Sequence, residues 1–141
     1  NRNLTEAGAL YTLALNGYFA LGDEIQVADA LTVIGELIAA HDPPVAARLL
    51  GAVHAIQDAH DISPTGPIAQ RAAVTETHLR ESLHSGLFET ELARGRTLSL
   101  VEARLDAIEA VRAVENEHPA GNPNPPRSST PPSGPGPARW R

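Results

Sequence analysis

Two sets of histidine and carboxylate side chains are the residues of this sequence whose types and spacing could support chemistry. His54, Asp58 and Asp61 stand at positions i, i+4 and i+7, so a helix that extends through all three would carry them on one face. Imidazole and carboxylate groups gathered in this way can bind a divalent metal ion. The same spacing recurs on solvated helix faces, and we interpret this set as a polar stripe at a helix end.

His78, Glu81 and His84 form a similar set further along the chain. The sequence has no His-Glu-x-x-His pair to support a zinc hydrolase, and no Gly-x-Ser-x-Gly elbow to expose a serine nucleophile. It also lacks cysteine and lysine, which excludes thiolate metal sites and the lysine of a phosphate-binding G-x-x-x-x-G-K-[ST] loop. We therefore expect no catalytic residue, no metal site and no cofactor.

The distribution of charge argues against nucleic acid as a direct partner of this chain. Through His118, eight arginines face 17 acidic residues, a net charge of −9, whereas the remaining residues carry three arginines and no acid. A body of this charge repels a phosphate backbone. No apolar run approaches the roughly 20 residues that span a membrane, and no signal-peptide pattern opens the chain, so we expect a cytoplasmic location.

The elements that must position these side chains are predicted to be helices. Alanine is abundant, β-branched runs are scarce, and aromatic residues make up only 4% of the chain. Alanine is the strongest helix former, so we expect an all-α fold with a core of leucine, isoleucine, valine and alanine. Apolar periodicity predicts about six helices, near residues 4–21, 24–40, 43–59, 67–84, 86–95 and 100–114.

Capping residues and apolar stripes give these helices their predicted ends and faces. The predicted N-caps are Thr5, Asp23, Asp42, Ser85 and, within a Ser99–Glu102 capping box, Ser99. In the first helix the apolar stripe comprises Leu10, Leu13, Ala14, Gly17 and Leu21, and Gly17 is predicted to allow the close approach of a neighbouring helix.

Residues 22–59 are predicted to form a helical hairpin around which the other helices stack. The helix at 24–40 carries two apolar stripes, so we expect other helices on two of its sides, with Glu24, Asp29 and Glu36 left on its solvent face. Asp42-Pro43-Pro44 is a strong helix boundary, and the short turn predicts antiparallel packing. Gly35 is the predicted crossing point of this hairpin.

The C-terminal residues 118–141 differ in composition from the rest. Eight of the twelve prolines fall after His118, and the stretch also contains three glycines and Trp140, the only tryptophan. Such a stretch cannot bury enough apolar surface to become ordered, so it is predicted to be disordered. Its Pro-x-x-Pro spacings, at 123–126 and 132–135, are expected by chance. The predicted organisation is therefore a helical domain at 1–117 followed by a disordered tail at 118–141.

The central hairpin resembles a tetratricopeptide unit, a helix-turn-helix repeat of 34 residues. Leu31, Ile34, Gly35 and Ile38 match its first helix, and Ala47 matches the small position of its second. Gly51 departs from that pattern, which expects a large aromatic residue there. A short tetratricopeptide-like α-solenoid of antiparallel hairpins is therefore expected.

More specifically, the chain is similar to the C-terminal region of actinobacterial LuxR-type and AfsR-type signalling ATPases, which are transcriptional regulators. The matching features, within about residues 8–113, are LGD at 21–23, AARLLGA at 46–52, Ala55, Phe88, GRTLS at 95–99 and Glu102-Ala103. AARLLGA is the most specific of these. The resemblance implies a scaffold for partner or effector binding, with ATPase activity confined to another part of a longer regulator.

We therefore expect a non-catalytic helical segment that acts through protein contacts. Because a short helical stack exposes apolar end faces, residues 1–21 are predicted to lean on a preceding repeat, and the chain alone is predicted to be marginally stable or to self-associate. The chain begins with Asn, which also favours a piece of a longer protein. The alternative function is a free-standing bundle that binds a small effector between the second, third and fourth helices.

Overall fold

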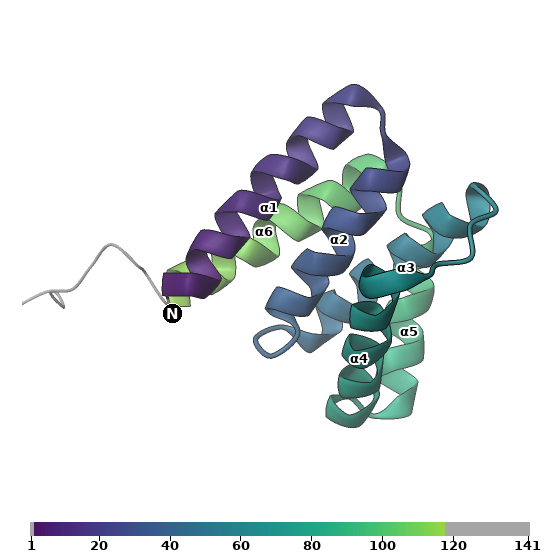
Figure 1. Cartoon of the computed structure of the whole chain (residues 1–141). Helices are drawn as coiled ribbons and strands as arrows, with labels where there is room; N and C mark the ends of the chain where they lie inside the picture. The colour runs from purple at the N-terminus through teal and green to yellow at the C-terminus, as the bar shows by residue number, and fades with distance from the viewer. Residues whose placement is uncertain (1, 118–141) are drawn as a thin grey trace, which may run out of the picture.

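The computed structural model describes residues 2–117 and folds them into six α-helices without a strand. Figure 1 shows their arrangement, in which α1 and α6 lie along one side and α4 and α5 at the other end. An all-α fold of six helices is thus confirmed, whereas the predicted disordered tail at 118–141 lies outside the described residues. The helices are α1 (Arg2–Leu21), α2 (Glu24–Ile38), α3 (Pro43–Ala59), α4 (Gly66–Ser82), α5 (Ser85–Arg96) and α6 (Leu100–Glu117).

Helix α2 is the centre of the fold. It packs against α1, α3, α4 and α6, and its side chains Val27, Leu31 and Ile34 are fully buried. A helix with apolar stripes on two sides is stable only if other helices pack on both sides, and these four helices do so. The predicted two-sided burial of this helix is confirmed. One hydrophobic core, built mostly of leucine, isoleucine, valine and alanine, runs through all six helices.

Helices α3 and α5 approach each other main chain to main chain at Gly51 and Gly95. A Cβ built on Gly51 would clash with the carbonyl oxygen of Leu92, and one built on Gly95 would clash with that of Arg48. At Gly35 the nearest atom would be the carbonyl oxygen of Ala46 at 3.9 Å, an ordinary contact. The nearest atom to Gly35 belongs to α3, its partner in the hairpin, so Gly35 does face α3. That Gly35 marks the crossing point of this hairpin stays a prediction. A large aromatic residue has no room at position 51, because α5 approaches there main chain to main chain.

The order of packing differs from a simple stack of consecutive hairpins. Helix α3 packs more extensively on α5 than on α4, and α6 returns to contact α1, α2 and α3 (Figure 1). In a solenoid each repeat contacts only its neighbours along the chain. The tetratricopeptide-like solenoid is therefore not confirmed.

Helix caps confirm most of the predicted boundaries. Asp23 Oδ1 accepts a hydrogen bond from the Gln26 amide, and Asp42 Oδ1 accepts one from the Val45 amide. At α6, Ser99 Oγ accepts from the Glu102 amide while Glu102 Oε1 accepts from the Ser99 amide, which is a complete capping box.

Two predicted caps were wrong. Thr5 lies inside α1, which begins at Arg2, because the preceding residues continue the helix. Ser85 is the first residue of α5, and the side chain of His84 caps that helix in its place. Within residues 2–117, no helix combines the length and apolar character needed to cross a bilayer.

Candidate interaction surface

The apolar stripe of helix α1 is largely exposed, and no neighbour approaches Gly17 closely within residues 2–117. Leu10, Leu13 and Leu21 are 61%, 71% and 80% exposed, and a Cβ on Gly17 would meet nothing within 4 Å. The buried side of α1 instead carries Leu15 and Gly8, and Gly8 lies against Val111 of α6. From Ala7 to Leu21 the helix has no charged residue, so apolar spacing fits two faces and cannot decide between them. We call Leu10, Leu13, Gly17 and Leu21 the outer face of α1.

A groove of about 360 Å³ runs between α1 and α6 beside this outer face. Leu13 belongs to both, and Arg112 and Glu115 give the groove a polar rim. On α6, Leu105 shares a helix face with the groove residues Ile108 and Arg112 and is itself 47% exposed. The groove is lined by Ala9, Thr12, Leu13, Asn16, Ile108, Val111, Arg112 and Glu115. The outer face of α1 and this groove together form the α1–α6 surface.

Arg104 fixes α6 against α1 beneath this surface. Its guanidinium donates a hydrogen bond of 2.8 Å to Asn16 Oδ1 and stacks 4.4 Å from the ring centre of Phe19. A cation over an aromatic face is attracted by the ring, so both contacts hold the two helices in register. The two helices that form the walls of the groove are thus joined by these side-chain contacts.

The side chains of His54, Asp58 and Asp61 do not come together in the structure. Helix α3 ends at Ala59, and Asp61 follows in a turn with φ of 56°, so it does not share a helix face with His54 and Asp58. Asp58 forms an ion pair with Arg96 of α5. Within residues 2–117, no group of three histidine or carboxylate side chains is arranged to hold a metal ion.

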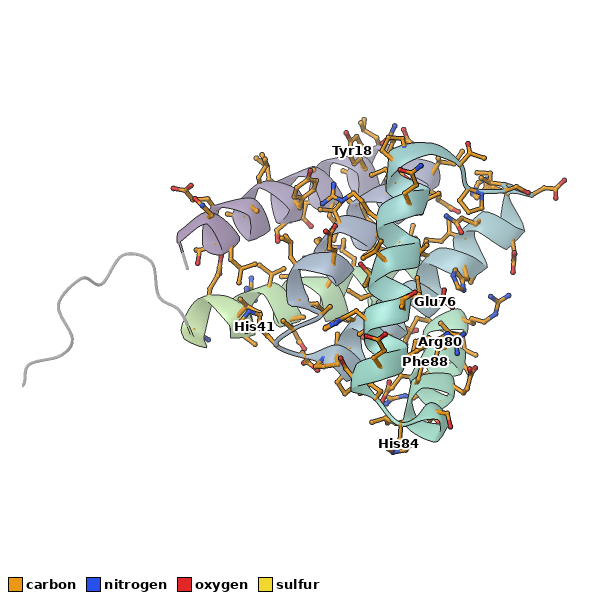
Figure 2. All side chains as sticks on the ribbon, turned by 60° about the horizontal axis from the view of Figure 1, so that its bottom comes forward. Tyr18, His41, Glu76, Arg80, His84 and Phe88 are labelled. Carbon is orange, nitrogen blue, oxygen red and sulfur yellow. The ribbon has the colours of Figure 1, made fainter. Side chains whose placement is uncertain are left out.

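The second set has a structural role at the α4–α5 turn. His84 Nδ1 accepts a hydrogen bond of 3.1 Å from the Leu87 amide and so caps α5, while the imidazole of His78 lies near the Ser82 hydroxyl one turn away. Figure 2 shows His84 at the end of this hairpin, with Arg80 and Phe88 side by side. Arg80 stacks 4.3 Å from the ring centre of Phe88, so these polar residues stabilise the hairpin.

A partly buried ion network that sequence reasoning missed ties together α3, α5 and α6. Arg48 Nε donates to Glu91 Oε1 at 2.9 Å, and its Nη1 donates to Asp106 Oδ2 at 3.1 Å. Glu91 is only 6% exposed and also pairs with Arg94. Burial alone would lower the pKa of Arg48, but the hydrogen bonds to Glu91 and Asp106 outweigh it and raise that pKa. In the sequence, the one indication of this network was an arginine, Arg48, within the otherwise apolar AARLLGA stretch.

A second concavity, of about 260 Å³, lies between α2, α3 and the start of α4. The connection from α3 to α4 forms one wall, and the left-handed residues Asp61 and Gly66, with φ of 56° and 83°, set its course. Its walls are mostly apolar, and Asp29 is the one charged side chain among them. We call this concavity the α2–α4 cleft. Its apolar walls comprise Ile25, Ala28, Ile56, Ile62, Pro64, Pro67, Ile68 and Ala69.

Asp29 was predicted to lie on the solvent face of α2 with Glu24 and Glu36. It lies on the same side of the helix as Glu36, seven residues before it, but it is half-buried, whereas Glu24 and Glu36 are exposed. Glu24 pairs with His60 at 2.9 Å, and Glu36 pairs with Arg71 at 2.7 Å, both near the surface. Asp29 is half-buried at the cleft, and within residues 2–117 its carboxylate has neither a hydrogen bond nor an ion pair. Burial, and to a lesser extent the nearby charge of Asp23, raise the pKa of Asp29.

Comparison of this chain with protein-family models, with curated proteins and with solved structures found no match.

Proposed function

We propose that this chain is a non-catalytic protein-interaction segment that docks an amphipathic helix on the α1–α6 surface. The observation that carries the proposal is the outer face of α1, where three leucines stand exposed around a glycine on a helix side without charge. A single exposed leucine is unremarkable on a protein surface, but a stripe of them at helical spacing is typical of a docking face.

The shape of the surface favours a helix as its occupant. Recognition of a helix by a groove uses apolar anchors at i, i+3, i+4 and i+7, and Leu10, Leu13, Gly17 and Leu21 follow that spacing. Gly17 lacks a side chain at the middle of this stripe, so a second helix can approach closely there. The polar rim formed by Arg112 and Glu115 would define the orientation of that helix.

Burial of the leucines would supply the driving force. Covering a fully exposed leucine is favourable by ~1.5–3 kcal/mol, and these three side chains are more than half exposed, so each contributes roughly 1–2 kcal/mol. Together, the contributions of the three leucines offset part of the entropic cost of association.

The resemblance to the C-terminal region of LuxR-type and AfsR-type regulators supports a particular partner helix. In such a regulator the occupant would be a helix of the preceding part of the same helical region, and docking would couple this segment to the ATPase module. Signal transduction would then proceed through helix contacts, with no reaction performed by residues 2–117.

Thermal unfolding of the isolated chain at several concentrations tests this proposal. Without its partner helix, the chain is expected to cover the α1–α6 surface with a second copy, so its melting temperature should rise with concentration. A sharp melt of a monomer, independent of concentration, would contradict the proposal.

A further inference from the structure

We propose that the α2–α4 cleft binds a small organic ammonium ion, with Asp29 as its counter-ion and the isoleucine side chains of the cleft around its apolar body. The contrast among the three acids of α2 is the first support. Glu24 is hydrogen-bonded to His60 and Glu36 is paired with Arg71, whereas Asp29 has no such partner among residues 2–117 and lies in the cleft.

The lining of the cleft restricts the charge of its ligand. Besides Asp29, its polar side chains are Gln57, Ser63 and Thr65, and none of the lining residues is basic. Burial, and to a lesser extent the like charge of Asp23, oppose ionisation of the Asp29 carboxylate. An ammonium group would remove that penalty by pairing with the carboxylate, whereas a carboxylate or phosphate ligand would add to it.

The volume of the cleft restricts the size of the ligand. A cavity of roughly 150 Å³ holds benzene, and sites for drug-sized molecules begin near ~300 Å³. At about 260 Å³, the cleft suits a single ring or branched alkyl group that carries a short aminoalkyl arm. Ile25, Ile56 and Ile68 supply the apolar contacts for that body.

Isothermal titration of the full chain at neutral pH with three probes that share a 2-phenylethyl body and differ in the charge of the terminal group tests this site. 2-Phenylethylamine is expected to bind saturably, 2-phenylethanol about tenfold more weakly or worse, and 3-phenylpropionate not at all. Failure of the amine to bind, or equal binding of the amine and the alcohol, would overturn the proposal.

Two variants assign the binding to Asp29. Asp29→Asn should reduce the affinity for 2-phenylethylamine at least about tenfold, to that of the alcohol, because it removes the charge and keeps the shape. Glu36→Gln, on the same helix and outside the cleft, should leave the affinity unchanged. An unchanged affinity in Asp29→Asn would overturn the proposal.

Amide NMR of the unmodified chain locates the ligand without reliance on any variant. Addition of 2-phenylethylamine should shift resonances at 25–29 and 62–69, and shifts confined to α1 and α6 would overturn the assignment. Binding in this cleft does not depend on the α1–α6 surface, so Leu13→Glu should leave it intact.

Discussion

Gly51 of α3 and Gly95 of α5 lie where these two helices cross, each against the main chain of the other helix. A Cβ on Gly51 would stand 3.1 Å from the Arg96 amide nitrogen, and one on Gly95 would stand 3.0 Å from that of Ala52, besides clashing with a carbonyl oxygen in each case. Main-chain atoms cannot rotate away as a side chain can. Among the glycines of the described residues, Gly51 and Gly95 are therefore the two that leave least room for any side chain.

Substitution of either glycine should separate the two helices. Gly51→Ala and Gly95→Ala are each expected to lower the free energy of unfolding by on the order of 3 kcal/mol, at the upper end of overpacking costs. Urea denaturation followed by circular dichroism measures this change.

Gly35→Ala is the matched control for these variants. Its new Cβ would lie 3.9 Å from the nearest atom, and alanine in a helix interior is favoured over glycine by up to about 1 kcal/mol. The variant should be as stable as the original chain or more stable. If Gly51→Ala were as stable as Gly35→Ala, the close crossing of α3 and α5 would be incorrect.

Arg48 of α3, which is partly buried and pairs with the buried Glu91, should matter more than a surface ion pair. Arg48→Met leaves Glu91 buried without its main partner, so a loss of stability on the order of 3 kcal/mol is expected. Arg71→Met breaks a pair whose side chains are both 41% exposed, and its cost should remain within about 1 kcal/mol. Equal losses in the two variants, measured by urea denaturation, would contradict the role of the Arg48 network.

The raised pKa of Asp29 predicts how its replacement changes stability with pH. The folded state binds the Asp29 proton more tightly than the unfolded state, so this residue favours folding at low pH and loses that contribution as pH rises through its folded pKa. Asp29→Asn should therefore be more stable than the original chain at neutral pH, with the difference vanishing in acid below the ordinary aspartate pKa. Thermal melts of both chains from neutral to acidic pH measure this stability difference. A stability gain of Asp29→Asn that grows as the pH falls would contradict the prediction.

The two serines at predicted helix starts should differ in their contribution. Ser99→Ala removes half of a capping box and should cost about 1 kcal/mol. Ser85→Ala should change stability little, because the cap of α5 is His84 and alanine suits the first turn of a helix. A larger loss in Ser85→Ala than in Ser99→Ala would show that α5 begins at a different residue.

Local features of the fold could be predicted from the sequence because neighbouring residues determine them. Asp23 and Asp42 cap helices through amides three residues away, and the two apolar stripes of α2 require cover on both sides. The crossing of α3 and α5 joins Gly51 to Gly95, far apart in the chain, and no spacing rule selects that pair over Gly35.

The candidate surface and cleft were less accessible to sequence reasoning for physical reasons. Because α1 is apolar on more than one side, its periodicity could not show that Leu10, Leu13 and Leu21 face outward. Asp29 was placed on the solvent face because charged residues usually lie there. Its half-buried position depends on the path of residues 60–65, which the left-handed backbone at Asp61 and Gly66 determines.

The most direct test of the proposed function measures association through the outer face of α1. Leu13 of α1 and Val74 of α4 are both 71% exposed, so Leu13→Glu and Val74→Glu add the same charge at equally exposed positions on different faces. Sedimentation equilibrium from low to high micromolar concentration should show that the original chain and Val74→Glu self-associate, whereas Leu13→Glu remains a monomer with unchanged helix content. Association of Leu13→Glu to the same extent as Val74→Glu, or a monomeric original chain throughout, would contradict the assignment of the α1–α6 surface as the docking site.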